Sequence, residues 1–245
     1  MSNNTFIQWM RQMYGKVHTT VYSSVKTNLK PENLAFLRNI EKEMNKQNSL
    51  FTPLSHLDAV VFDFETSGFI PEQGDQILSI GAIKLRNNRI EKEQTFYSLV
   101  QFTGTMSPEV RALTGLMESE LRVAPPLAEV LLSFFEFVQD DVLIAHHATH
   151  EKRFLQYANW KVFKKVFQQR IVDTSLVFRI FPSKQPLISL DDYCFQYGVK
   201  LENRHHALGD AILTAKLWEI YTIKLIEEGY LTLHEVYGSL GKMKQ

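Results

Sequence analysis

HLDAVVFDFETSG, residues 56–68, combines an apolar run with two acidic residues and a glycine turn. The run from His56 to Glu65 is rich in β-branched and aromatic residues and is short, which predicts a buried strand. Asp63 and Glu65 stand two positions apart near its end. Because successive strand side chains project to opposite faces, these two carboxylates share one face and Phe64 projects to the other.

Two neighbouring carboxylates at the end of a buried strand are costly unless a cation neutralises them. Hard divalent cations prefer oxygen ligands, so Mg²⁺ or Mn²⁺ suits this pair. Thr66, Ser67 and Gly68 then turn the chain and offer hydroxyls and backbone N–H groups beside such a site. A single D-x-E pair is a weak signal, since many such pairs lie solvated at sheet edges. The apolar run before Asp63 argues against that interpretation here.

The chain beyond this strand predicts an α/β fold. Residues 76–86 and 89–101 form two further strands, joined by a turn at Asn87-Asn88. Short strands follow at 142–145 and 171–173. Helices are predicted to start at 107–109 and to span 127–139, 150–159, 173–180, 189–197, 207–228 and 231–240. This order predicts a mixed sheet, with a three-stranded antiparallel start and later parallel strands, flanked by helices.

Five of the eight histidines fall in two clusters. His146, His147 and His150 stand in IAHHATHEKRFL, and His205 and His206 stand in NRHHALGDAILTAKL. A histidine at the mouth of a helix and an acid one turn inside can converge on one site, as His205 and Asp210 would. Alanines at 207, 211 and 215 would let that helix lie close to a sheet.

Each of these residues also has an ordinary structural interpretation. Glu151 opens a predicted helix, where an acid is favoured by the helix dipole. His205 and Asp210 taken alone could be a histidine at a helix start and a solvated acid. Glu151 is nevertheless a candidate additional carboxylate beside Asp63 and Glu65, because it directly follows a short apolar strand.

Composition limits the class of protein. The 245 residues hold 27 Lys and Arg against 27 Asp and Glu, and a neutral chain argues against a generic polyanion binder. The single Cys194 excludes a disulfide framework and favours a reducing compartment. No apolar run long enough for a membrane span and no signal peptide is recognised, so a cytoplasmic location without membrane contact is expected.

The zero net charge conceals an uneven division. Residues 1–57 hold seven Lys and Arg against three Asp and Glu, a net charge of +4, which leaves −4 for residues 58–245. Residues 1–55 are predicted to form a helical extension, with apolar spacing over 6–17 and after Pro31. The extension could pack on the main domain or act as a docking arm, and both interpretations stay open. The predicted limits are 1–55 for the extension, 56–228 for the main domain and 229–245 for a short tail.

Several motifs in one order resemble the DEDD exonuclease superfamily, in its histidine-containing subgroup with a ribonuclease H-like fold. The first motif of that family, D-x-E followed by a threonine and a glycine turn, matches Asp63 to Gly68. The third, H-x-A-x-x-D-A, matches His205 to Ala211. The stretches Ala112–Leu116, Ala124–Pro126, Val172–Thr174 and Ser189–Asp191 also resemble the family, so the likeness covers about residues 56–220. The chain is similar to the proofreading epsilon subunit of bacterial DNA polymerase III.

The second motif departs from the family. Members usually show H-N-A-x-F-D, where this chain has His146-His147-Ala148-Thr149-His150-Glu151. Glu151 thus replaces a metal-binding Asp, and its extra methylene displaces the carboxylate by about 1 Å, a shift that can cost roughly 10²-fold in rate. Two alternatives stay open. The first is a catalytically weakened nuclease-like module that binds or acts as a scaffold. The second is another metal hydrolase, which acts on a small phosphoester or in zinc-dependent chemistry, with His146, His150 and Glu151 as part of a zinc site.

The resemblance implies a 3′-to-5′ exonuclease that releases nucleoside 5′-monophosphates from a single-stranded DNA or RNA 3′ end, with DNA favoured. It implies two Mg²⁺ or Mn²⁺ ions held by Asp63, Glu65, Glu151 and Asp210, with His205 as general base. It also implies that the terminal nucleotide contacts the turn at 66–68 and the region around Leu116, with His147 in the place of the usual Asn. If the chain has a polymerase or another protein partner, the expected contact is through residues 1–55, and a free-standing enzyme is equally compatible with the sequence.

Overall fold

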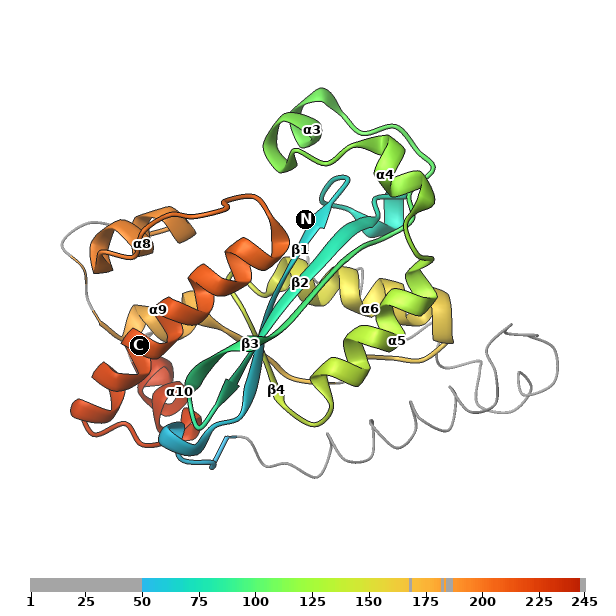
Figure 1. Ribbon diagram of the computed structural model, residues 1–245. Helices are drawn as coiled ribbons and strands as arrows, with labels where there is room; N and C mark the ends of the chain where they lie inside the picture. The colour runs from blue at the N-terminus through green and yellow to red at the C-terminus, as the bar shows by residue number, and fades with distance from the viewer. Residues whose placement is uncertain (1–49, 168, 182, 184–186, 243–245) are drawn as a thin grey trace, which may run out of the picture. The chain divides into compact units, whose positions relative to one another are not determined.

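A computed structural model of the chain describes residues 50–167, 169–181, 183 and 187–242. A five-stranded sheet in the order β3-β2-β1-β4-β5 forms the centre of this part (Figure 1). Its strands are β1 (Ala59–Thr66), β2 (Ile77–Arg86), β3 (Arg89–Leu99), β4 (Val142–Ala145) and β5 (Ile171–Asp173). The pairs β1–β2 and β2–β3 are antiparallel, whereas β1–β4 and β4–β5 are parallel. The predicted α/β class with a mixed sheet is confirmed.

Helices lie on both faces of the sheet. They are α3 (Pro108–Thr114), α4 (Glu118–Val123), α5 (Leu127–Val138), α6 (Thr149–Phe163), α7 (Thr174–Val177), α8 (Leu190–Tyr197), α9 (Ala207–Glu227) and α10 (Leu233–Lys242). Three short 3₁₀ turns, η1 (Leu54–His56), η2 (Pro71–Gln73) and η3 (Phe178–Ile180), complete the described elements. In Figure 1, α9 crosses one face of the sheet, and α5 and α6 lie on the other.

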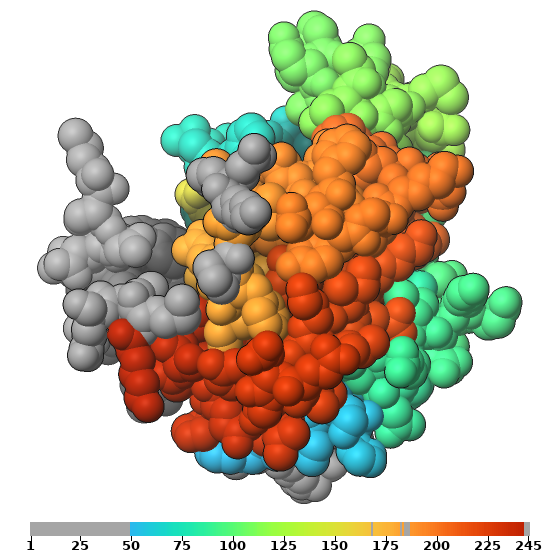
Figure 2. Space-filling view, turned by 90° about the vertical axis from the view of Figure 1, so that its left-hand side faces the viewer, coloured from blue at the N-terminus to red at the C-terminus, as the bar shows by residue number. Residues whose placement is uncertain are grey.

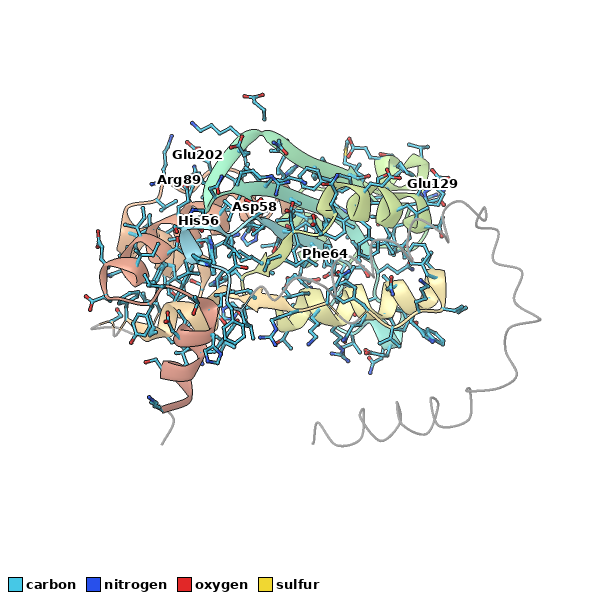
Figure 3. The ribbon with its side chains drawn as sticks, turned by 90° about the horizontal axis from the view of Figure 1, so that it is seen from below. His56, Asp58, Phe64, Arg89, Glu129 and Glu202 are labelled. Carbon is cyan, nitrogen blue, oxygen red and sulfur yellow. The ribbon has the colours of Figure 1, made fainter. Side chains whose placement is uncertain are left out.

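Alternate side chains of β1 pack against different helices on the two faces of the sheet. Phe62 and Phe64 pack on Phe134 of α5, with ring centroids 5.6 and 6.4 Å apart. Figure 3 shows Phe64 inside the domain, and it shows Asp58, the residue before the first residue of β1. Val61 belongs instead to the core cluster that contains Leu217 and Trp218 of α9. Asp63 and Glu65, in step with Val61, therefore project toward α9.

Some predicted boundaries were wrong. The strand expected from His56 begins at Ala59, because residues 54–56 form the η1 turn, which directs both Leu54 and Leu57 into the core. The helix predicted over 173–180 is divided into α7 and η3. The short helix α4, which lies between two predicted helices, was not anticipated. The helices predicted at 6–17 and after Pro31 lie outside the described residues.

Both flanks of the described chain pack against the same core. Leu54 and Leu233 belong to one buried cluster, and the Leu54 N–H donates to the Leu231 carbonyl at 2.8 Å. The domain limits at 56 and 228 stay a prediction, and this packing favours somewhat wider ones. Among the described helices, none has the length and apolar character required to cross a bilayer.

Candidate active site

Two elements bring three acidic side chains to the carboxyl end of β1. Asp63 and Glu65 come from β1, and Asp210 from the first turn of α9. One carboxylate oxygen of each lies within 4.8 Å of the others, which makes these three a group that could hold a metal ion. Glu65 is 9% exposed and Asp210 is 7% exposed. Residues separated by almost 150 positions in the sequence thus meet at one buried place.

The start of α9 lies close to the three carboxylates because the β2 residue beneath it, Gly81, has no side chain. Gly81 pairs with Asp63 across β1 and β2 and with Tyr97 across β2 and β3. A Cβ atom on Gly81 would lie 2.0 Å from the backbone nitrogen of Leu208, so only glycine permits this approach. On β3, the Tyr97 ring stacks on the ring of His206, the residue before α9, with centroids 4.3 Å apart.

Glu151 contributes a fourth carboxylate from the first turn of α6. Glu151 lies outside the group of three. In addition to burial, the charge of Glu151 raises the pKa of Asp63, and the charge of Glu65 raises the pKa of Glu151. Its side chain is 4% exposed, and Oε2 has no hydrogen-bonding partner among the described residues. Glu151 is therefore electrostatically coupled to Asp63 and Glu65.

Burial and mutual repulsion disfavour the charged form of these acids. Burial, then Glu151, Asp210 and Glu65, raise the pKa of Asp63 well above its ordinary value. Burial and Asp210 raise the pKa of Glu65 to about 7. Burial is also the main cause that raises the pKa of Glu151 to about 8, with Asp173 and Glu65 adding to it. Such a cluster is stabilised by a bound cation, which offsets both costs.

Two buried carboxylate oxygens of this cluster are unsatisfied. Asp210 Oδ1 and Glu151 Oε2 lack hydrogen-bonding partners within the described part of the chain. Buried carboxylate oxygens normally have a partner, so an unsatisfied pair beside two further carboxylates fits an oxygen-ligated divalent cation. Among the described residues, His146, His150 and Glu151 do not form a comparable group.

The backbone of His205 lies beside the Asp210 carboxylate. Its backbone N–H donates to Asp210 Oδ2 at 3.2 Å, and its φ of 59° places it in the left-handed region. Arg204, which the sequence analysis did not single out, donates from its guanidinium to both Asp210 and Asp191. No motif marked Arg204, because its role depends on the spatial approach of α8.

The turn after β1 is organised by Asp75. Its Oδ2 accepts from the Ile70 N–H at 2.8 Å, and its Oδ1 lies 3.4 Å from Ser67 Oγ. Ser67 Oγ in turn accepts from the Gln76 N–H at 2.9 Å. A Cβ on Gly68 would lie 2.4 Å from the Asp75 carboxylate, so the turn closes tightly around this acid. Sequence reasoning missed Asp75, an isolated acid without a motif.

The remaining predicted substrate residues differ in what they contact. Thr66 Oγ1 donates to the Gly68 carbonyl at 2.7 Å and lies 3.3 Å from His150 Nε2. His147 Nε2 is hydrogen-bonded to the Ile188 carbonyl at 2.6 Å, which ties its loop to the segment before α8. Leu116 is buried in a small cluster with Leu121 and its neighbours. The exposed apolar side chains beside Leu116 are instead those of Leu113 and Met117.

Burial disfavours the charged form of His146. Its Nδ1 is hydrogen-bonded to Thr174 Oγ1 at 2.8 Å. Burial, followed by the nearby charges of His147 and Arg204, lowers the pKa of His146 to about 3. Its ring packs against Tyr193 of α8, with centroids 5.4 Å apart. These contacts give His146 a structural place between β4, α7 and α8.

Comparison with known proteins identifies relatives of this chain. The family model described as Exonuclease, of the RNase T type, matches residues 60–218. A DNA polymerase III subunit epsilon-like protein of Rhodobacter capsulatus is 34% identical over 167 residues, which cover 67% of this chain and 24% of that protein. DNA polymerase III subunit epsilon of Aquifex aeolicus is 29% identical over 171 residues, 69% of this chain and 80% of that protein. The alignment with a PolC-type DNA polymerase III of Clostridium perfringens covers only 12% of that protein.

Solved structures show the same fold at low identity. Cell-death related nuclease 4 superimposes with a TM-score of 0.61 and 14% identity, covering 73% of this chain and 67% of that one. The nuclease domain of 3′hExo, a DEDDh family member bound to rAMP, gives 0.59 and 18%, covering 72% and 95%. Exonuclease I of E. coli in complex with a dT13 oligonucleotide gives 0.62 and 14%, covering 71% and 42%.

Proposed function

The chain belongs to the exonuclease family whose model spans residues 60–218, and from that premise we propose that it removes nucleotides from the 3′ end of single-stranded nucleic acid. Water would be the nucleophile and nucleoside 5′-monophosphates the products, with DNA favoured over RNA. The observation that carries this proposal is the meeting of Asp63, Glu65 and Asp210 at one buried place, with Glu151 acting on the same cluster.

Asp63, Glu65, Glu151 and Asp210 would hold two Mg²⁺ or Mn²⁺ ions. When bound, such ions neutralise charge at the scissile phosphate and lower the pKa of an attacking water. The protein's own contribution is to fix four oxygen ligands within a packed interior, where electrostatic interactions are stronger than in water. The raised pKa values of Glu65 and Glu151 mean that ligand deprotonation and cation binding are coupled.

His205 would act as the general base. An imidazole accepts a proton near neutral pH, and the His205 backbone is held beside the Asp210 carboxylate. The backbone around Thr66, Ser67 and Gly68, fixed by Asp75, would bind the terminal nucleotide next to the carboxylates. Stacking on exposed apolar side chains such as Leu113 would tolerate any base, so little sequence preference is expected.

The relatives support this assignment without fixing its biological setting. Exonuclease I is a fold neighbour crystallised with single-stranded oligonucleotides, and the epsilon subunits are relatives by sequence. A polymerase contact through residues 1–55 accords with the epsilon resemblance. A stand-alone nuclease accords with it equally.

Digestion of a substrate panel tests the proposal. Single-stranded DNA, duplex DNA and short RNA, each labelled at the 5′ end, are incubated with the full chain in Mg²⁺ or in Mn²⁺. We expect stepwise shortening of the single strand, slower attack on the blunt duplex, and nucleoside 5′-monophosphates as products. Retention of the strand without turnover would support the alternative of a weakened binding module, which Glu151 in place of Asp motivates.

A further inference from the structure

Arg204 links the candidate metal site to a helix that carries none of its ligands. Its Nη1 donates to Asp210 Oδ2, and its Nε donates to Asp191 Oδ1. The Arg204 side chain is 21% exposed and that of Asp191 is 39% exposed, so the bridge runs from the surface at Asp191 to the buried Asp210. Asp191 belongs to the first turn of α8. Because a guanidinium is planar and presents donors in fixed directions, a bridge between two carboxylates restricts the orientation of both.

The two oxygens of Asp210 lie in different surroundings. Oδ2 accepts from Arg204 and from the His205 N–H at 3.2 Å. Oδ1 has no hydrogen-bonding partner among the described residues, and the side chain is only 10% exposed. One oxygen is therefore fixed by the protein, while the other is left for a ligand. This is the arrangement expected of a metal-binding carboxylate with an outer partner.

The anchor of this bridge is itself well held. Ser189 and Asp192 form a reciprocal capping box at the start of α8, next to Asp191. His147 Nε2 is hydrogen-bonded to the Ile188 carbonyl at 2.6 Å, which fastens the same segment to the loop after β4. Figure 2 shows the segment with α8, in orange, on the molecular surface between the green α3–α4 segment and the red α9 and α10. Asp191 thus offers Arg204 a fixed counter-charge.

We propose that Arg204, anchored on Asp191, is a positioning residue that turns Asp210 so that Oδ1 faces the divalent cation. This inference rests on the proposed function, since it concerns the same metal site. It adds that cation affinity depends on a residue outside the carboxylate set and on the docking of α8.

A purely electrostatic role for Arg204 makes the opposite prediction. Its positive charge lies beside Asp210, so it repels an incoming cation once the carboxylates are ionised. If charge were its main contribution, removing it would strengthen metal binding measured at a pH above the pKa values of Glu65 and Glu151. If positioning is its main contribution, removing it weakens metal binding. The two roles are therefore separable by one direct measurement.

That measurement is Mn²⁺ binding to the full chain, followed by the electron paramagnetic resonance signal of free Mn²⁺ without nucleic acid. Outer partners of metal ligands typically contribute about 10–100-fold to affinity or activity, so Arg204→Gln is expected to weaken Mn²⁺ binding by about 10-fold or more. Arg204→Lys keeps the positive charge but loses the planar guanidinium that bonds both carboxylates. This variant is therefore expected to recover only part of the Mn²⁺ affinity. Asp191→Asn removes the anchor and should weaken binding in the same direction. The control is Lys200→Gln, from an exposed pair with Glu202 at 3.0 Å, which should bind as the unaltered chain does.

Each outcome decides one question. Mn²⁺ binding by Arg204→Gln that equals or exceeds that of the unaltered chain overturns the positioning role. Full recovery by Arg204→Lys overturns the bridge, because a single cationic donor would then be enough to position Asp210. Absence of Mn²⁺ binding by the unaltered chain overturns the proposed function itself. Should Arg204→Gln not fold, as judged by thermal unfolding, Asp191→Asn and Arg204→Lys decide. In turnover assays, the variants should show reduced kcat at subsaturating Mn²⁺ with little change in KM for the strand.

Discussion

Gly81 of β2 lies directly against the backbone of Leu208, so that a Cβ atom at position 81 would stand 2.0 Å from the Leu208 nitrogen. Gly81 also pairs with Asp63, which means that the start of α9 lies over the same row of the sheet that carries the first acid. The distance between Asp63 and Asp210 is therefore determined by the missing side chain at position 81.

Gly81→Ala should displace the start of α9 and with it Asp210. The clash involves backbone atoms, which cannot move aside as a flexible side chain would. Since a misplacement of about 1 Å can cost roughly 10²-fold in rate, we expect a loss of kcat of about that size, measured as release of mononucleotides. Gly238→Ala is the matched control, because a Cβ there meets no atom within 4 Å in α10. Equal activity of Gly81→Ala and the unaltered chain would contradict the described packing.

Glu151→Gln should abolish nuclease activity and yet stabilise the metal-free protein at alkaline pH. Burial raises the pKa of Glu151 to about 8, so its charged form is disfavoured in the folded state. Gln removes that charge, and each kcal/mol gained raises the Tm of a domain this size by about 2–4 °C. Calorimetry in EDTA at pH 9 and a strand-shortening assay measure the two effects. Glu129→Gln, an exposed acid in the first turn of α5 that is labelled in Figure 3, should change neither.

Stability of the metal-free protein should fall as pH rises. Glu65, with a pKa of about 7, and Glu151, with a pKa of about 8, hold protons in the folded state that the unfolded chain has lost above about 4.5. A raised carboxyl pKa contributes stability that is present below the unfolded value and is lost as pH passes the folded value. We expect Tm in EDTA to decrease between pH 5.5 and pH 8.5. Mg²⁺ should reverse most of that decrease, with the larger effect at the higher pH. A flat or rising Tm in EDTA would argue against the buried cluster.

Asp75→Ala should weaken substrate binding more than chemistry. Asp75 fixes the turn after β1 through Ile70 and Ser67 and is not a candidate metal ligand. Hydrogen bonds of this kind contribute about 0.5–1.5 kcal/mol each, so KM for a short single strand should rise by about 3–10-fold with kcat nearly unchanged. Gln73→Ala, in the same loop and exposed, is the control. A proportional fall in kcat with constant KM would assign Asp75 a different role.

The sequence predicted the parts of the fold that depend on local pattern. The apolar run before Asp63 and the hairpin at Asn87-Asn88 were predictable, because strand periodicity and turn residues are local signals. The motif around His205 and Asp210 likewise placed a histidine and an acid at a helix start, and the structure has α9 begin there. Only the family resemblance, and no single motif, predicted that the acidic residues of separate motifs meet at one site.

Other features depend on contacts between distant segments. Nothing local distinguishes Gly81 from any strand glycine, because its importance comes from the backbone of Leu208 more than 120 residues later. Arg204 was an ordinary basic residue until α8 brought Asp191 beside it. Leu116, which the resemblance offered as a substrate contact, is buried, and the exposed apolar surface belongs to its neighbours. Such relationships arise only when the chain is folded.

Shortening of a 5′-labelled single strand tests the central claim most directly. The unaltered chain, Asp210→Asn and Glu129→Gln are compared in Mg²⁺ and in Mn²⁺, with products resolved at single-nucleotide length. The carboxylate site predicts a ladder that shortens one nucleotide at a time from the 3′ end with the unaltered chain and with Glu129→Gln, and an intact strand with Asp210→Asn. A strand left intact by the unaltered chain in both metals, or digested equally by Asp210→Asn, would contradict it.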